Sequence, residues 1–466
     1  MKRVDFSNGR TLPNILATAL PMLVAQILNL LYNIVDRIYI ARIPETGTAA
    51  LGAVGLCFPI VILITAFTNM YGSGGAPLFS IAHGAGHRRE AADIQNMSFF
   101  LLITTAVVLT LVGELTGRPV LALFGASDNA MIYALPYLRI YLIGTIFSMI
   151  ATGMNPFINA QGYSTTGMTT VIIGAVANII LDPVFIFVFG MGVEGAAIAT
   201  VLSQALSAAF VLRFILGLKV DYRARLMRLE EFRGNLSLAR RIIGLGMAAF
   251  IMQFTNSLVS ICCNSVLSKT GGDLYVSIMT IVNSARQMLE TPLHAIMEGT
   301  SPIISYNYGA QRYKSVREAG VFMFLLGMGY ALSMWLVILF FPRLIIGIFS
   351  SDRTLIEDAV PAFHLYFSTF IFMVFQYCGQ TTFKSLGKKN QAIFFSLFRK
   401  VVIVVPLTYI LPYVFGMGTD GVFAAEPVSN VVGGMACFIT MLVTVLPELK
   451  QKQAELEAEQ KAAGLS

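Results

Sequence analysis

Long stretches of this sequence contain no Asp, Glu, Lys or Arg. A bilayer core about 30 Å thick requires about 20 apolar residues in a helix. Such uncharged stretches lie between Arg10 and Asp36, Glu45 and Arg88, Asp93 and Glu114, Arg139 and Asp182, Arg241 and Lys269, Glu318 and Arg343, Asp358 and Lys384, and Lys400 and Asp420. Only 12% of the 466 residues are charged, against roughly 25% in a soluble domain. The chain is therefore predicted to be an all-α polytopic membrane protein.

Loop signals divide the uncharged stretches into twelve predicted transmembrane helices. The Gly-Tyr-Ser-Thr-Thr-Gly segment at 162–167 and the Gly-Met-Gly segment at 190–192 are typical of turns between helices. The predicted spans are 12–40, 50–78, 93–115, 131–153, 165–189, 194–216, 241–267, 276–305, 316–341, 356–382, 391–414 and 420–446.

The two halves of the chain resemble each other at an offset of about 225 residues. Gly74 and Pro77 align with Gly299 and Pro302, and the Phe-Gly-Met-Gly of 189–192 recurs at 415–418. Because each half has six spans, both halves have the same orientation, which predicts two parallel-repeat six-helix lobes. Such duplicated lobes are typical of secondary transporters. The predicted divisions are an N-terminal lobe at 1–216, a cytoplasmic linker at 217–240, a C-terminal lobe at 241–446 and a cytoplasmic tail at 447–466.

The distribution of basic residues predicts the orientation of the chain. With the N-terminus inside, the outer loops carry only Arg42, Arg118, Lys269, Arg343 and Arg353 of the 32 Lys and Arg residues. The positive-inside rule then places both termini in the cytoplasm. The basic linker is expected to contact lipid headgroups. Basic residues between apolar segments do not indicate a nucleic-acid partner, despite the net charge of +7.

The five cysteines and four histidines lack the spacing of a metal site, and the cysteines lie within apolar stretches. We therefore expect buried, structural cysteines and no cofactor. A nucleophile paired with a base, a metal-ligand set and a phosphate-binding loop are also missing from the sequence pattern, so an enzyme is not expected.

Ionisable residues inside a span are costly and usually functional. In the first span, Gln26, Asn29, Asn33 and Asp36 are spaced by three or four residues and therefore share one helical face. This polar stripe predicts contact with a cavity, although packing against a neighbouring helix is an alternative. Pro21 precedes the stripe and permits a kink there, which makes it a candidate hinge.

The fifth span carries a second intramembrane acid. Asn178 and Asp182 are four residues apart, and Pro183 cannot donate a hydrogen bond to the carbonyl of Ile179. Thr200 in the sixth span is predicted to lie at a similar depth, as is Asp36. These oxygen atoms suit a small hard cation, so the four polar residues are a candidate coupling site. A purely structural role for the two acids is the alternative.

The C-terminal half differs at these positions. Its first span has no acid, Thr408 replaces Asp182, and Glu426 occupies the repeat position of Thr200. The eighth span nevertheless carries several polar residues, and the eleventh begins with Arg399 and Lys400. Internal ion pairing and a role in substrate handling or a second proton site both remain open. The polar residues of the eighth span are Arg286, Gln287, Glu290, His294 and Glu298.

Two motifs resemble the multidrug and toxic compound extrusion (MATE) family, most closely its DinF-like prokaryotic branch. They are Ile-Val-Asp-Arg-Ile-Tyr-Ile-Ala-Arg at 34–42 and Leu-Asp-Pro-Val-Phe-Ile-Phe at 181–187, which is followed by Gly-Val-Glu-Gly-Ala-Ala-Ile-Ala-Thr at 192–200. The Gly-Ala turns at 84–86 and 308–310 support the resemblance, which covers about residues 10–446. It implies twelve helices in two lobes, a cavity open alternately to either side, and exchange of drugs for protons or sodium ions.

The family's N-lobe cation site maps onto Asp36, Asn178, Asp182 and Thr200. Tyr137 matches a cavity-lining position, whereas Arg37 departs from the small or polar residue usual after the acid. Together with the polar stripe, Gln287 and Glu290, Tyr137 is a candidate substrate-cavity residue. Pro183 joins Pro21 as a candidate hinge.

The sequence thus predicts a monomeric antiporter of a prokaryotic inner membrane that exports small amphipathic, cationic compounds. Asp36 and Asp182 would bind the coupling ion, H⁺ or Na⁺, from outside. The alternative is a flippase for lipid-linked oligosaccharides, which would need a basic central cavity. Arg139, Arg286 and Arg399 are the intramembrane basic residues that keep this alternative open.

Overall fold

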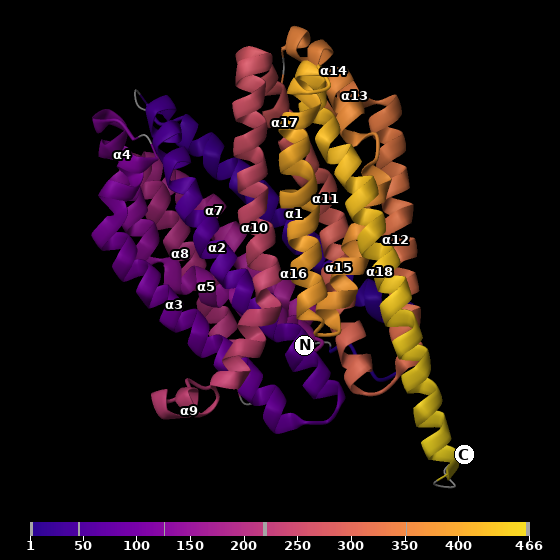
Figure 1. The fold of residues 1–466 in the computed structure, drawn as a ribbon. Coiled ribbons are helices and arrows are strands. Elements are labelled where there is room, and N and C mark those ends of the chain that lie inside the picture. The colour runs from indigo at the N-terminus through magenta and orange to yellow at the C-terminus, as the bar shows by residue number, and fades with distance from the viewer. Residues whose placement is uncertain (1–2, 45–46, 125, 218–220, 351, 463–466) are drawn as a thin grey trace. The chain divides into compact units, whose positions relative to one another are not determined.

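The computed structural model describes residues 3–44, 47–124, 126–217, 221–350 and 352–462, which form helices joined by short turns (Figure 1). The helices are α1 (Thr11–Ala41), α2 (Gly47–Gly84), α3 (Arg88–Leu123), α4 (Asp128–Ile143), α5 (Thr145–Gly153), α6 (Asn155–Ala160), α7 (Ser164–Pro183), η1 (Val184–Val188), α8 (Gly192–Ile215), α9 (Leu229–Gly234), α10 (Leu236–Thr270), α11 (Gly272–Gly309), α12 (Tyr313–Phe340), α13 (Pro342–Ile346), α14 (Arg353–Phe367), η2 (Phe370–Phe372), α15 (Met373–Ser385), α16 (Lys389–Leu397), η3 (Phe398–Val404), α17 (Val405–Tyr413) and α18 (Gly418–Ala462).

The predicted all-α membrane fold is confirmed. Within the described ranges, nine helices are long and apolar enough to cross a membrane, and eleven spans result if each of two bent helix pairs counts as one. The remaining predicted span corresponds to α11, whose charged residues include Arg286, Glu290 and Glu298. A helix that carries so many charges in a membrane is expected to turn them towards protein or a water-filled cavity and away from lipid.

Two predicted spans are broken rather than continuous. The helix expected at 131–153 bends by 53° between α4 and the segment Thr145–Ala160, and the one expected at 356–382 bends by 41° between α14 and the segment Phe370–Ser385. The first break allows a close approach, since a Cβ on Gly144 would lie 2.4 Å from Val201 Cγ2. The breaks near residues 144 and 369 occupy equivalent positions of the two halves.

The turns repeat as well. Gly162 and Gly387 have φ angles of 87° and 71°, Gly190 and Gly416 have 65° and 66°, and Gly192 and Gly418 have 55° and 57°. L-residues with side chains rarely adopt these conformations, which explains glycine at both members of each pair. The offset of 225 to 226 residues therefore relates backbone conformations and not only residue types.

The chain forms two compact units. Unit 1 comprises Met1–Asp5 and Pro21–Phe250, and unit 2 comprises Phe6–Leu20 and Ile251–Ser466. Of the three boundaries, one lies between Asp5 and Phe6, and the other two fall inside the continuous helices α1 and α10. The division of the chain at the 217–240 linker stays a prediction. The described part of that linker packs within unit 1, where the backbone amide of Arg225 donates to Asn96 Oδ1 at 2.8 Å and Tyr222 accepts from Gln95. Lys219 lies outside the described residues.

The first helix of each half therefore begins in the unit formed mainly by the other half. In unit 2, the start of α1 packs against α11, where a Cβ on Gly299 would lie 2.6 Å from Ala19 Cα. In unit 1, the start of α10 packs against α2, where a Cβ on Gly246 would lie only 1.8 Å from the Met70 carbonyl oxygen. Small residues at both contacts let the helix backbones approach closely, as is common between membrane helices.

This close approach predicts that Gly246→Ala destabilises the protein. The added methyl group would collide with a backbone carbonyl, so α2 and α10 would have to move apart. We expect a loss of about 1–3 kcal/mol, the usual cost of overpacking, measured as a lower midpoint of thermal unfolding in detergent. Gly320→Ala in α12 is the matched control because nothing lies within 4 Å of its added Cβ. An equal effect of both substitutions would contradict the prediction.

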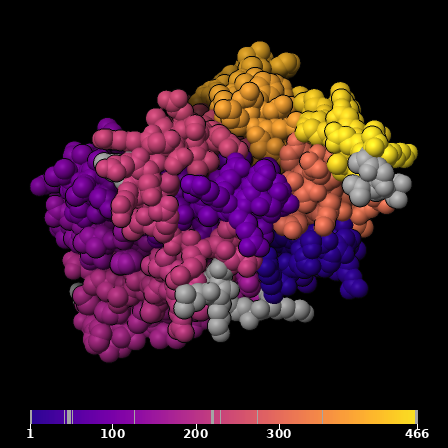
Figure 2. Space-filling view, turned by 90° about the horizontal axis from the view of Figure 1, so that it is seen from below, coloured from indigo at the N-terminus to yellow at the C-terminus, as the bar shows by residue number. Residues whose placement is uncertain are grey.

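Several loops of unit 1 that were predicted to face the cytoplasm lie at one end of its helices. The backbone amide of Val4 donates to the carbonyl of Gly162 at 2.9 Å, and Arg3 pairs with Asp221. Arg241 pairs with Glu90 at the start of α3 at 3.1 Å. Figure 2 views the end that carries α9 and shows the segment after residue 220 spread over unit 1. Their position at one end agrees with the prediction that successive loops of this half alternate between the two sides of the membrane.

Candidate functional site

Two intramembrane carboxyl groups meet inside unit 1. Asp36 lies near the end of α1, and Asp182 lies near the end of α7, immediately before the π-helical turn η1. Their side chains interact directly. Asp182 is fully buried. Two acids in contact in a low-dielectric environment cannot both carry an uncompensated charge at low cost, so this pair requires a proton or a cation.

The surroundings of Asp182 supply further oxygen atoms. Asn178, one turn earlier in α7, donates its amide Nδ2 to Asp182 Oδ1 at 3.1 Å, so its own Oδ1 remains available. Within the described residues, three buried oxygens of the site have no hydrogen-bond partner: Asp36 Oδ1, Asp182 Oδ2 and Asn178 Oδ1. Buried acceptors are rarely left unsatisfied. Carboxylate and amide oxygens are also the ligands that hard cations prefer.

Aromatic residues border the acid pair. Tyr137 of α4 is buried and stacks on Tyr141, with ring centroids 6.3 Å apart. It lies within electrostatic range of both acids, as does Tyr32. Tyr32 and Tyr141 were not among the predicted site residues. The signal for Tyr32 was its position one turn before Asp36, which places both residues on the same face of α1.

The other predicted N-lobe residues lie as follows. Thr200 donates its hydroxyl to the carbonyl of Ala196 at 2.9 Å, and within the described residues no hydrogen bond joins it to either acid. Asn29 and Asn33 are exposed, and Asn33 Nδ2 donates to the Asn29 carbonyl at 2.6 Å. Gln26 is half-buried. The guanidinium of Arg37 lies 5.3 Å from the ring centroid of Phe58, close enough for a cation–π interaction.

The two prolines differ in their effect on the helices. Pro21 lies within the continuous helix α1, at the residue where unit 1 begins. Pro183 is the last residue of α7, and the backbone changes there from α-helix to the π-helix η1. π-helical turns occur frequently at functional sites.

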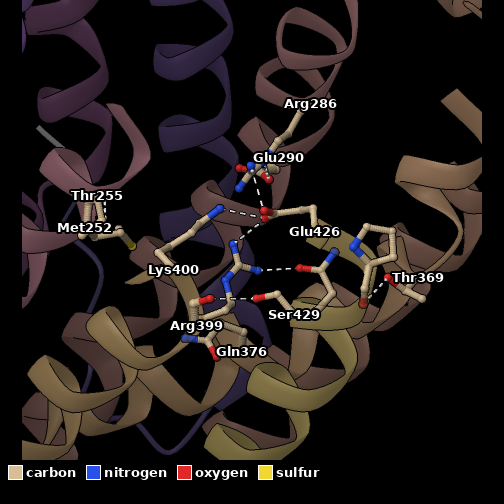
Figure 3. A network of polar contacts seen from close by, with 12 residues as sticks. Met252, Thr255, Arg286, Glu290, Thr369, Gln376, Arg399, Lys400, Glu426 and Ser429 are labelled. Atoms are coloured by element: carbon tan, nitrogen blue, oxygen red, sulfur yellow. Dashed lines mark hydrogen bonds and ion pairs between the residues drawn. The ribbon is translucent and has the colours of Figure 1, made fainter. Parts of the chain in front are cut away.

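A second charged group is buried in unit 2 (Figure 3). Glu426 Oε1 of α18 lies 2.8 Å from Lys400 Nζ, 3.1 Å from Arg399 Nη2 and 3.3 Å from Arg286 Nη1. Arg286 also pairs with Glu290, which accepts a hydrogen bond from the Tyr377 hydroxyl at 3.0 Å. We call Arg286, Glu290, Arg399, Lys400 and Glu426 the C-lobe cluster.

Local backbone geometry brings the cluster together. Arg399 and Lys400 are neighbours in the π-helix η3, and both reach Glu426. Gly433 leaves room for the stem of Arg399, because a Cβ there would lie 2.9 Å from Arg399 Cγ. Arg399 also donates Nη1 to Asn430 at 2.6 Å. The sequence indicated the charges in these helices but not that they converge.

Neighbouring polar residues of α11 are less enclosed. Gln287 is exposed, and His294 Nε2 lies 3.9 Å from Glu290 Oε2. Glu298 pairs with Lys384 at 3.5 Å, outside the cluster. Arg139 belongs to unit 1, where it pairs with Glu114 at 3.7 Å. Its charge therefore has a partner of its own.

The model of the MatE family matches residues 21–184 and 248–410, one match in each half of the chain. The chain belongs to the MatE family. Members of this family are transporters rather than enzymes, and the two matched segments follow the internal repeat.

Relatives and solved structures agree with this membership. This MatE-family protein is 22% identical over 401 residues to the multidrug export protein MepA of Staphylococcus aureus strain MRSA252, covering 86% of this chain and 87% of the relative. Its fold matches an outward-facing multidrug resistance MATE family transporter of the MOP superfamily with a TM-score of 0.88 at 22% identity, covering 97% and 99% of the two chains. A MATE structure in the straight conformation matches with a TM-score of 0.89 at 23% identity, over 97% and 99%.

Proposed function

We propose that this protein is a secondary antiporter that exports small amphipathic, cationic organic compounds across a prokaryotic inner membrane in exchange for protons or sodium ions. The observation that carries the proposal is the interaction between the half-buried Asp36 and the fully buried Asp182, with three oxygen atoms left without partners in the described residues. The curated relative is a multidrug exporter, which supports an organic substrate.

The acid pair provides a coupling mechanism. When a proton or sodium ion binds, the repulsion between the carboxylates is removed and the site becomes neutral. Release of that ion to the cytoplasm restores the negative charge of the site. The conformation that the protein favours therefore depends on whether an ion is bound. One charge that crosses the membrane contributes about 2.3 kcal/mol per 100 mV. One or two ions are therefore enough to drive useful export.

The hinge in this proposal is Pro21. The residues of α1 before Pro21 belong to unit 2, and those from Pro21 onward belong to unit 1. Bending of α1 at this point would move the segment that carries Asp36. The free carbonyl created by proline makes such bending less costly than in a regular helix.

Transport by purified protein in liposomes tests the function. Wild-type protein should drive efflux of a fluorescent cationic dye under a proton gradient or a sodium gradient, and the effective gradient identifies the ion. If neither gradient moves the dye, the antiporter proposal is wrong. Translocation of a fluorescent lipid-linked oligosaccharide in the same vesicles would instead favour the flippase. The intramembrane arginines suggested this alternative.

Replacing Pro21 by Ala should slow transport without unfolding the protein. Alanine restores the backbone donor that proline lacks and stiffens α1, so conformational change becomes slower while both compact units keep their packing. We expect about a 10-fold lower turnover, equivalent to about 1.4 kcal/mol on the barrier, with a thermal midpoint at or above that of wild type. Pro59→Ala in α2 is the control. Unchanged turnover in Pro21→Ala would rule out the hinge.

A further inference from the structure

The C-lobe cluster contains more positive than negative groups. Arg286, Arg399 and Lys400 surround Glu290 and Glu426, and within the described residues no other carboxylate pairs with them. The formal sum is three positive and two negative charges, a net charge of +1. An uncompensated charge in the interior of a membrane protein is costly, so the arrangement favours one further negative group.

Lys400 has unused hydrogen-bonding capacity. An ammonium group has three donors, yet in the described part of the chain its Nζ bonds only to Glu426 Oε1. Its side chain is 3% exposed, so solvent cannot easily satisfy the remaining donors. A buried donor without a partner is unfavourable, and a buried charge without a partner is more so. One anionic oxygen could satisfy both.

The cluster is more exposed at α11 than at Glu426 and Lys400. The Arg286 side chain is 14% exposed, and His294, which lies 3.9 Å from Glu290, is 37% exposed, whereas Glu426 is 4% exposed. Exposure therefore increases from Lys400 and Glu426 towards α11, where Gln287 is exposed. In Figure 3, Arg286 and Glu290 project from one helix towards Glu426, and Lys400 approaches the same carboxylate from another.

We propose that the C-lobe cluster binds the carboxylate or phosphate group of an amphiphilic substrate between Arg286, Arg399 and Lys400. The inference rests on the proposed export function and extends its substrate class from cations to zwitterions. Guanidinium and ammonium groups that share a single carboxylate oxygen can rearrange around a second anionic group, since charge-assisted hydrogen bonds to carboxylates and phosphates are strong. The aromatic hydroxyls of Tyr366 and Tyr377, which hydrogen-bond Arg286 and Glu290, keep the two partners oriented.

Lys400→Met separates this role from a structural one. The substitution removes one positive charge and leaves two arginines against two glutamates, so the cluster becomes electrically balanced and should remain folded. Lys400→Arg keeps the charge. Lys384→Met is the matched control, because Lys384 is a partly buried lysine of the same unit that pairs with Glu298 outside the cluster.

Equilibrium binding of two dyes to purified protein in detergent tests the proposal by fluorescence anisotropy. Rhodamine 110 carries a carboxylate, and rhodamine 123 is its methyl ester. Wild type should bind the carboxylate dye, and the ratio of the two dissociation constants should shift about 10-fold against that dye in Lys400→Met. Lys400→Arg and Lys384→Met should keep the wild-type ratio.

Three outcomes would overturn the proposal. They are failure of wild type to bind rhodamine 110, an unchanged ratio in Lys400→Met, and an equal shift in Lys384→Met. In the first two cases, Lys400 would be held neutral or serve packing alone. Because binding is measured without any ion gradient, a failure of gradient-driven export would not affect this readout, and the two proposals fail separately.

Discussion

Asp182→Asn is expected to abolish gradient-driven efflux while leaving the protein folded. Asparagine keeps the shape of Asp182 and its contact with Asn178 but cannot bind a proton or neutralise a sodium ion. The variant would then let the dye cross the membrane only down the electrochemical gradient of the dye itself. Loss of one coupled charge removes about 2.3 kcal/mol per 100 mV, which corresponds to an about 50-fold lower sustainable dye gradient. Dye efflux from liposomes under an imposed potential measures this ratio.

Asp36→Asn should have the same effect, because the two carboxyl groups act as a pair. Asp128→Asn is the control, since Asp128 is an exposed acid at the start of α4 in the same unit. Undiminished transport in both Asp36→Asn and Asp182→Asn would refute the coupling site. Loss of transport in Asp128→Asn as well would show that the assay reports general damage.

Glu426→Gln is expected to cause the largest loss of stability of any single substitution considered. Glutamine fills the same space but leaves Lys400, Arg399 and Arg286 gathered around a neutral amide. Breaking a buried ion pair by removing one partner costs about 3–5 kcal/mol. We expect a correspondingly lower free energy of unfolding, measured by thermal or chemical denaturation of the protein in detergent.

Glu357→Gln provides the contrast. Glu357 accepts two hydrogen bonds of 2.8 Å from Arg343, but both side chains are more than half exposed. Exposed pairs contribute only about 0–1 kcal/mol, so this variant should be nearly as stable as wild type. Combining Glu426→Gln with Lys400→Met removes one stranded cation and should recover part of the lost stability. Equal stability of Glu426→Gln and Glu357→Gln would contradict the burial argument.

Hydropathy predicted the helices because membrane spans require long apolar stretches. The expected span at 12–40 corresponds to α1 at Thr11–Ala41, and the span at 194–216 corresponds to α8 at Gly192–Ile215. The pairing of Asn178 with Asp182 was also predictable, because a spacing of four residues places both side chains on one helical face. Local periodicity contains this information directly.

Features that depend on tertiary packing were not predictable in the same way. No Pro or Gly occurs between Pro361 and Gly379, so no local signal marks the break near Thr369. The convergence of Arg399 and Lys400 on Glu426 depends on a π-helical turn, which periodicity rules for α-helices do not include. The unit boundaries inside α1 and α10 depend on which helices each segment packs against, and charge and hydropathy do not specify this.

The exchange of first helices between the units has a consequence for the two halves as separate polypeptides. A chain cut in the linker would yield two fragments. The first would lack the start of α10, which fills a glycine-lined contact in unit 1, and the second would lack the start of α1, which fills a glycine-lined contact in unit 2. Neither half could complete its own packing. Fragments expressed from two genes should therefore accumulate in the membrane only when both are produced together.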